Sequence, residues 1–295
     1  MEAFVECVPC VMRQALEAAL HATVDRTVHE EVLRRTALTL SRVDLREPSP
    51  VIIAAVHRIV REVTGLADPY AEAKSTCNHK ALALYPRLKD VVRRSDKPLE
   101  TALGLAAAGN MLDFIVDSGA DRTDLVNVMA ASLSDPFPAR IVSEFQEAVQ
   151  AARNILYLGD NAGEIVLDRL LIEHLPEKRI TFVVKGSPVV NDVTRQEAEA
   201  IGMTDLVRVI DNGSDLPGTV LRYCSEPFRK EFLRADLVIS KGQGNYESLS
   251  DADKDIFFLF KAKCAPIAEH LRCEVGRSIF RRTRPRSIDA PGKEP

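Results

Sequence analysis

Apolar residues in the second half of the chain fall into short runs that alternate with longer stretches of helical spacing. Four runs, at residues 155–158, 180–184, 206–210 and 237–240, have the length and composition of buried strands. Between them, at residues 163–175, 193–201 and 219–234, apolar side chains recur every three or four positions, as on one face of a helix. Strands that alternate with helices predict an α/β fold, a Rossmann-like, mostly parallel sheet with helices on both faces.

The first 150 residues show helical spacing instead. Helices are expected at residues 11–22, 30–43, 50–64, 70–92, 98–118 and 143–152, and Pro50 and Pro98 stand in the first turns of two of them. We therefore expect an all-helical N-terminal subdomain (1–150) packed on the edge of an α/β domain (151–280). Residues 281–295 combine charge and proline without apolar periodicity, which predicts a disordered tail.

A polar residue closes each predicted strand, in chain order Asp160, Lys185, Asp211 and Lys241. Open parallel sheets build their binding sites at the carboxyl ends of the strands, so these side chains are expected to share one crevice. Acids for a metal ion and lysines for an anion together suit a phosphorylated ligand.

Asp160 is followed by Asn161, and a second carboxylate, Asp192, comes shortly after the second strand. Two carboxylates and an amide oxygen, with no His or Cys beside them, suit Mg²⁺ or Mn²⁺ better than zinc. The alternative is that Asp160 and Asp192 only cap the helices that follow them, because Asp is a favoured N-cap residue.

The fourth strand leads into a glycine-rich turn. Gly242 and Gly244 let the backbone approach a ligand and expose its amides, while Lys241 could neutralise a phosphate and Asn245 could hold a further oxygen. The alternative is an ordinary turn between a strand and a helix. The chain has neither G-x-G-x-x-G after its first strand nor G-x-x-x-x-G-K-[ST], which disfavours a dinucleotide enzyme and a P-loop kinase or ATPase.

Two asparagines in the helical part are further candidates. Asn110 lies in the otherwise apolar stretch 102–114. Either it is solvated, or its helix end faces the crevice and Asn110 touches the substrate phosphate, with Asn78 doing the same from a neighbouring helix.

Cysteine usage indicates a reducing compartment. Six cysteines in a chain of 295 residues predict reduced thiols in a cytoplasm rather than a disulfide framework. Cys7 and Cys10 form an isolated CxxC, which could be two small apolar residues on a helix, a redox pair, or part of a metal site with Cys77.

Composition excludes several classes of protein. The 46% apolar and 28% charged content is that of an ordinary globular protein. There is neither a run of eighteen apolar residues nor a basic-then-apolar leader, so we expect no membrane span and no secretory signal. A net charge of −4 argues against general nucleic-acid binding. The oligomeric state is not indicated.

Taken together, the motifs resemble the metal-dependent damage-control phosphatases, the family long labelled as a domain of unknown function (DUF89). The resemblance covers roughly residues 1 to 275, and the N-terminal CxxC is similar to that of the prokaryotic branch. It rests on residues 159–164, 185–186, 191–194 and 241–246, joined upstream by residues 68–70, 74, 78, 103–110 and 113. In that family an Asp-Asn pair and a later Asp hold the metal, which by motif are Asp160, Asn161 and Asp192. The family's lysine and asparagine near the phosphate correspond to Lys241 and Asn245.

The resemblance implies a hydrolase of small phosphorylated metabolites, sugar-phosphate-like in kind, that needs a divalent metal ion (Mg²⁺, Mn²⁺, Co²⁺ or Ni²⁺). Asp160, Asp192 and Lys241 are the expected catalytic residues. The expected phosphate contacts are Lys185, Lys241, Gly242, Gly244, Asn245, Asn110 and Asn78. The nucleophile, water or an aspartate, stays open, with water favoured and Asp160 chiefly a ligand.

Two other functions remain as alternatives. One is S-adenosylmethionine-dependent methylation of carboxylates, which the wider family also raises, although the turn after the first strand lacks the glycine triplet usual for that cofactor. The other is a non-enzymatic, metal-dependent sensor of phosphometabolites, which would bind its ligand without releasing phosphate.

Overall fold

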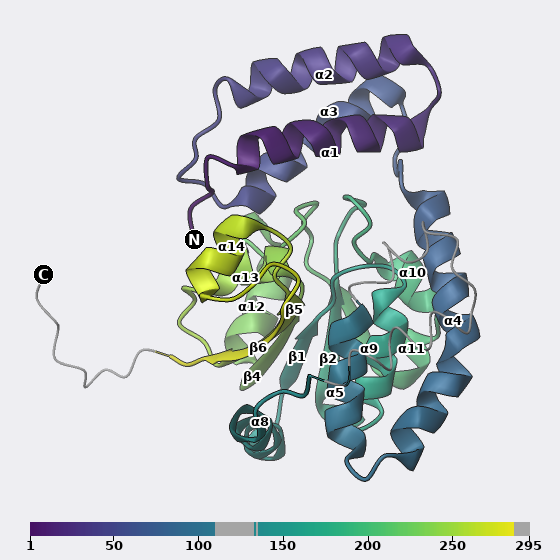
Figure 1. The fold of residues 1–295 in the computed structure, drawn as a ribbon, viewed down its shortest axis with the longest axis vertical. Coiled ribbons are helices and arrows are strands. Elements are labelled where there is room, and N and C mark those ends of the chain that lie inside the picture. Colours follow the sequence, from purple (N-terminus) through teal and green to yellow (C-terminus); the bar gives the residue numbers. More distant parts are fainter. Residues whose placement is uncertain (110–132, 134, 286–295) are drawn as a thin grey trace, which may run out of the picture.

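The computed structural model describes residues 1–109, 133 and 135–285. Within this part of the chain, six strands form one sheet in the order β3-β2-β1-β4-β5-β6 (Figure 1). Neighbours among β1 to β5 pair in parallel, and β6 pairs antiparallel with β5. The strands are β1 (Ile155–Leu158), β2 (Ile180–Val184), β3 (Arg208–Asp211), β4 (Leu237–Lys241), β5 (Ile256–Lys261) and β6 (Ser278–Thr283). The expected α/β fold is confirmed.

Both faces of the sheet are covered, which is why its strands are apolar at successive positions. Along β1, Ile155 and Tyr157 belong to one hydrophobic cluster, whereas Leu156 and Leu158 belong to another. Helices from both halves of the chain complete the first cluster, and helices that follow β1 in the chain complete the second (Figure 1). The helices that follow β1 in the chain are α9 (Glu164–Ile172), α10 (Arg195–Ala200), α11 (Met203–Leu206), α12 (Glu226–Arg234), α13 (Gln243–Leu249) and α14 (Ala265–Leu271), with short 3-10 helices η3 (Glu177–Arg179) and η4 (Leu221–Tyr223).

The N-terminal helices divide between two cores. They are α1 (Cys7–Ala22), α2 (Arg26–Leu40), α3 (Ser49–Thr64), α4 (Ala71–Arg94), α5 (Pro98–Ala108) and α8 (Ala139–Ala151). The first three form a bundle with its own core, which stands above the carboxyl edge of the sheet in Figure 1. In α1 the buried residues Val11, Ala15, Ala18 and Ala19 recur with the period of one helical face. By contrast, α4, α5 and α8 contribute to the hydrophobic core on the face of the sheet that Ile155 and Tyr157 line.

The structure differs from the expected elements in several places. The helix expected at residues 219–234 is divided into η4 and α12. β5 and β6 were not predicted, although 256–260 is a continuous apolar run. β3 begins at Arg208 because the residues before it complete the short helix α11. β6 extends to Thr283, past the expected tail boundary at residue 281. The strand is secured by Arg282, whose guanidinium pairs with Asp255 at 2.7 Å. None of the helices that the structure describes is long and apolar enough to cross a membrane.

Candidate active site

The candidate site lies where the strand order reverses. β1 and β4 are neighbours at the centre of the sheet, and from there the chain proceeds to β2 on one side and to β5 on the other. Asp160 follows β1 by two residues, and Lys241 ends β4. Ligands of open α/β sheets bind in the crevice outside such a switch point. The two strongest motifs of the sequence therefore lie at the place where such a crevice is expected.

Backbone hydrogen bonds bring the second carboxylate to the first. Asn161 and Asp192 form an isolated antiparallel bridge. The amide of Val193 donates to the carbonyl of Asp160 at 2.8 Å, and the amide of Ala162 donates to the carbonyl of Asn191 at 2.9 Å. Backbone hydrogen bonds thus join the loop after β2 to the loop after β1. The structure brings the three predicted metal ligands Asp160, Asn161 and Asp192 together, all buried.

Neither carboxylate caps a helix. The N-cap of α9 is Gly163, and the N-cap of α10 is Thr194, which forms a capping box with Glu197. The interpretation of Asp160 and Asp192 as simple N-caps is therefore wrong. Both carboxylates belong to the crevice rather than to a helix end.

Burial makes these carboxylates hard to ionise without a cation. Loss of solvation raises the pKa of Asp160 to about 6, and the neighbouring Glu164 contributes to the rise. Burial likewise raises the pKa of Asp192 to about 7; the ammonium of Lys185, 3.5 Å from its Oδ2, opposes this rise, and Asp160 adds to it. The pair needs positive charge that the buried side chains do not fully supply.

The buried charges around the crevice do not balance. The carboxylates are those of Asp160, Glu164, Asp168 and Asp192, and the ammonium groups are those of Lys185 and Lys241. With these six groups ionised the excess is two negative charges, which one divalent cation would neutralise. Buried Glu247, which also interacts electrostatically with Asp160, adds a further carboxyl group. No three His, Cys, Asp or Glu side chains of the described residues converge as a metal site. The candidate donor set instead joins two carboxylates to the amide of Asn161, the hard oxygen donors that Mg²⁺ and Mn²⁺ prefer.

Lys241 is fully buried, and its three donors all have partners. Its Nζ donates to Glu164 Oε1 and Asp168 Oδ1 at 2.6 Å each, and to the carbonyl of Ala106 at 2.9 Å. An ammonium group has three hydrogens to give. Direct contact with a phosphate would require Lys241 to leave one of these partners, so that role stays a prediction.

Other predicted phosphate residues also have partners. Lys185 donates to the carbonyl of Gly218 at 3.1 Å in addition to its ion pair with Asp192. Asn245 accepts from the Thr219 hydroxyl at 2.7 Å and donates to the carbonyl of Lys241 at 2.7 Å. These side chains shape the crevice wall, and whether they touch substrate stays a prediction.

The glycine turn is pressed against the first carboxylate. Gly242 has φ +83°, and a Cβ built there would overlap the carboxylate of Asp160. A Cβ at Gly244 would overlap the carbonyl of Pro217. Glycine at 242 is thus required both by its backbone conformation and by the space that Asp160 occupies.

Of the two asparagines predicted to contact the phosphate from the helical part, the structure describes one. Asn78, on α4 and buried, accepts a hydrogen bond at 2.6 Å from the amide of Gly163, so it holds the turn between Asn161 and α9. Asn110 lies outside the described residues.

Sequence reasoning missed three charged residues of the site. Glu164 and Asp168 are four apart on α9 and both face Lys241, a spacing that puts them on one side of a helix. Lys263 follows β5, a strand that was not predicted. Its side chain is exposed, and its amide donates to Gln243 Oε1 at 2.8 Å. Against the rise in pKa that burial imposes on Asp160, Lys263 is the strongest opposing cation, ahead of Lys185 and Lys241.

The CxxC lies at the start of α1, near Cys264, the residue that follows Lys263 and is the N-cap of α14. Burial raises the pKa of Cys7 to about 11, and Cys264 adds to this rise. Cys10 in turn adds to the rise in the pKa of Cys264. Cys77, which the sequence offered as a third partner, packs instead against Gly163.

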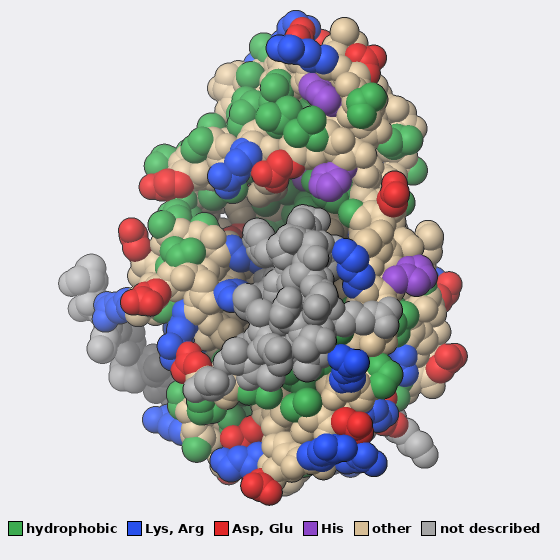
Figure 2. Space-filling model, turned by 45° about the vertical axis from the view of Figure 1, so that its right-hand side comes forward, with side chains coloured by type: hydrophobic (Ala, Val, Ile, Leu, Met, Phe, Trp, Pro, Cys, Tyr) green, Lys and Arg blue, Asp and Glu red, His purple; other side chains and the backbone are tan. Residues whose placement is uncertain are grey.

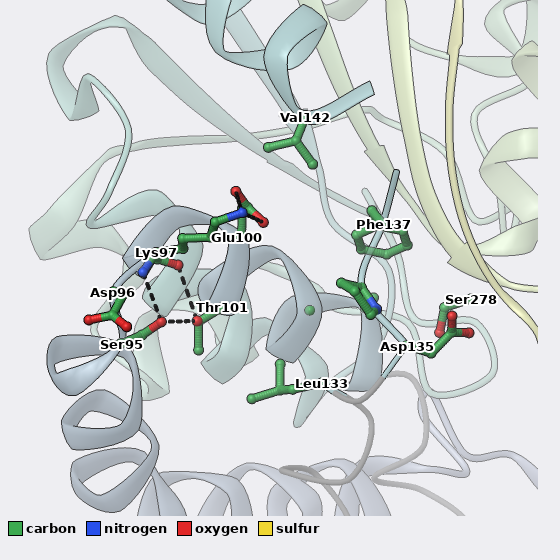
Figure 3. Close-up of a pocket in the computed structure, with 13 residues that line it drawn as sticks. Ser95, Asp96, Lys97, Glu100, Thr101, Leu133, Asp135, Phe137, Val142 and Ser278 are labelled. Atoms are coloured by element: carbon green, nitrogen blue, oxygen red, sulfur yellow. Dashed lines mark hydrogen bonds and ion pairs between the residues drawn. The ribbon is translucent and has the colours of Figure 1, made fainter. Parts of the chain in front are cut away.

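Two features of the surface lie outside the switch point. Figure 2 shows several Lys and Arg side chains on the surface beneath the α1–α3 bundle. A separate cavity of about 300 Å³ lies at the start of α5 (Figure 3). Its lining side chains already bind one another, as Thr101 donates to Ser95 at 2.7 Å and Lys97 pairs with Glu100 at 3.0 Å. None of the residues placed at the switch point lines this cavity.

Comparisons with known proteins agree with this arrangement. The family model described as the damage-control phosphatase ARMT1-like domain matches residues 3–279. A damage-control phosphatase of Pyrococcus horikoshii is 32% identical over 285 residues, which cover 95% of this chain and 97% of the relative. An uncharacterized protein of Methanocaldococcus jannaschii is 33% identical, with 93% of each chain covered. A damage-control phosphatase of Archaeoglobus fulgidus is 29% identical, covering 92% of this chain and 96% of the relative.

The fold is also similar to a solved structure. The crystal structure of a DUF89 family protein from Pyrococcus horikoshii matches with a TM-score of 0.87 at 29% identity. The match covers 96% of this chain and 99% of that protein.

Proposed function

Because the chain belongs to the damage-control phosphatase family of ARMT1-like (DUF89) domains, we propose that it is a metal-dependent phosphatase of small phosphorylated metabolites. The proposed substrates are sugar-phosphate-like, and the proposed metal ligands are Asp160, Asn161 and Asp192. The printed names of two relatives support phosphatase activity, and the chemistry of the crevice supports the requirement for a metal.

The observation that carries the metal site is the unbalanced charge at the switch point. Buried carboxylates that outnumber buried ammonium groups by two are costly unless a cation joins them. Asp160 and Asp192 lie in two loops that backbone hydrogen bonds join to each other, and Asn161 in the first of these loops offers an amide oxygen as a further donor. A divalent ion held there would act as a Lewis acid on the phosphoryl group.

The chain's own cations would then hold the substrate. Lys263 has an exposed side chain whose ammonium group acts electrostatically on Asp160, and its backbone amide donates to the side chain of Gln243, next to the glycine turn. Lys185 is tied to Asp192 and would balance that carboxylate. The first amides of α13, which begins at Gln243, have no acceptor inside their own helix. Groups of this kind stabilise the charge that gathers on phosphoryl oxygens during transfer.

The test follows release of inorganic phosphate from a panel of hexose phosphates while Mg²⁺ or Mn²⁺ is titrated. We expect no release with EDTA and recovery on adding metal. Asp192→Ala should abolish both Mn²⁺ binding and turnover, and Asp192→Asn should weaken Mn²⁺ binding because a neutral amide replaces a carboxylate.

The matched control is Asp211→Asn. Asp211 also ends a strand of the sheet, but it is exposed and accepts a hydrogen bond from the amide of Gly213. This variant should keep wild-type metal affinity and rate. Saturable binding of the phosphate ester without phosphate release would indicate a sensor of phosphometabolites rather than an enzyme. Wild-type turnover by Asp192→Ala would show that the proposed site is wrong.

A further inference from the structure

Glu164 joins the proposed metal ligands to the buried lysine. Its Oε2 accepts a hydrogen bond from Asn161 Nδ2 at 3.0 Å, and its Oε1 accepts one from Lys241 Nζ at 2.6 Å. The side chain is 1% exposed, and a Cβ built on Gly109 would lie 3.1 Å from its Cγ. Both carboxylate oxygens have partners and the backbone at the end of α5 closes over the side chain, so Glu164 has one available position.

The position of Glu164 decides which way the amide of Asn161 faces. Asn161 Nδ2 donates to Asp160 Oδ2 at 2.7 Å as well as to Glu164 Oε2. An amide nitrogen has two hydrogens, and here each is given to a carboxylate. Turning the amide over would set Oδ1 against two carboxylate oxygens and lose both bonds. The amide oxygen of Asn161 is therefore held on the side away from Glu164.

Glu164 is itself anchored on the far side of the crevice. Lys241 binds Asp168 Oδ1, which also accepts from the Tyr157 hydroxyl at 2.8 Å. The chain of contacts thus runs from β1 through Asp168 and Lys241 to Glu164 and ends on Asn161. All of its members are buried.

We propose that Glu164, held in place by Lys241, is the positioning residue of the metal site, because it turns the amide oxygen of Asn161 toward the ion. This inference rests on the proposed function, in which Asp160, Asn161 and Asp192 bind the metal. Lys241 then acts on the metal through Glu164, to which its Nζ donates a hydrogen bond.

The test reverses donor and acceptor in the hydrogen bond between Asn161 and Glu164 and measures Mn²⁺ affinity by electron paramagnetic resonance. In Glu164→Gln the new amide keeps its oxygen on the charged Lys241 and directs its nitrogen at Asn161. Asn161 must then turn its own nitrogen toward the ion. We expect Mn²⁺ affinity to fall by about 10- to 100-fold, the range found when a group behind a metal ligand is altered.

Asn161→Asp reverses this effect. In the variant that combines Glu164→Gln with Asn161→Asp, the introduced amide nitrogen donates to one oxygen of the introduced carboxylate and leaves the other oxygen for the ion. Glu164→Gln should therefore raise Mn²⁺ affinity in the Asn161→Asp background, although it lowers affinity in the wild type. Equal losses in both backgrounds, or no loss in either, would overturn the proposal.

Asp168→Asn is the matched control for charge. It removes one carboxylate from Lys241 without touching Asn161, and should change Mn²⁺ affinity less than Glu164→Gln does.

A second measurement needs no variant: the side-chain amide protons of Asn161 should exchange slowly with solvent before and after Mg²⁺ is added, and fast exchange would contradict the proposal. If Asp192→Asn leaves Mn²⁺ affinity unchanged, the proposed site itself fails; if it lowers affinity and Glu164→Gln does not, only the role of Glu164 fails.

Discussion

Replacing Gly242 by Ala tests whether the glycine turn exists to make room for the Asp160 carboxylate. Two costs can be separated. The first is conformational: φ is +83° and ψ is 152°, a region adopted almost only by glycine, which costs a residue with a Cβ about 1–3 kcal/mol. The second is local, because the new methyl group would occupy the space of the Asp160 carboxylate and push it out of the crevice.

Gly276 provides a control that also has a positive φ but lacks the steric overlap. Its φ is +90°, and the nearest atom to a built Cβ, Lys261 Cε, is 3.8 Å away, an ordinary contact. Gly276→Ala should therefore lower the free energy of unfolding by about 1–2 kcal/mol and leave the site unchanged. Gly242→Ala should lose at least as much stability. Its Mn²⁺ affinity should also fall by about 100-fold or more. Displacing a metal ligand is a larger change than altering a residue that only hydrogen-bonds to a ligand, which costs about 10- to 100-fold.

The assays are urea unfolding, Mn²⁺ titration and phosphate release, each run on both variants and the wild type. If Gly242→Ala binds Mn²⁺ as tightly as Gly276→Ala does, Gly242 is not needed to make room for Asp160. If the two variants lose metal affinity in parallel with stability, the loss is a general effect of backbone strain and not of a displaced Asp160.

Three further predictions concern parts of the fold outside the crevice. Burial lowers the pKa of His57 to about 4 from an ordinary value near 6.5. Its neutral form therefore stabilises the fold above pH 6.5, and up to about 3 kcal/mol is lost as the pH falls toward 4. Urea unfolding of the wild type and His57→Leu across this range should show the wild type losing more; parallel curves would contradict the pKa. A chain that ends at residue 285 should keep the wild-type melting temperature, whereas one that ends at residue 280 should melt several degrees lower, because it loses the ion pair of Arg282 with Asp255; equal melting of the two would show that this half of β6 adds nothing. Replacing Cys7 and Cys10 by Ser should leave phosphate release largely intact, and stoichiometric zinc or iron in the wild type, lost in the variant, would overturn this.

Local pattern was enough to predict most of the sheet and the three candidate ligands. Period and run length depend on neighbours in sequence, so β1, β2 and β4 could be placed from the chain alone. The polar residues that follow them could be assigned to one edge because parallel strands end together. β5 and β6 escaped because their pairing is a contact between distant segments, and the Arg-rich sequence of β6 is stabilised by side chains on other elements.

The tertiary structure alone decided how the charges are shared. Lys241 and Glu164 are 77 residues apart in the chain, and the sequence offered the lysine to a phosphate. Folding places it beside two carboxylates of α9, where burial makes an unpaired ammonium too costly to leave free. Residue types and local spacing could identify Asp160, Asn161 and Asp192 as candidate metal ligands, because the preference of an ion for oxygen donors does not depend on the fold. Which carboxylate each buried lysine pairs with depends on distance and burial, and both are set only when β1, β4 and α9 pack together.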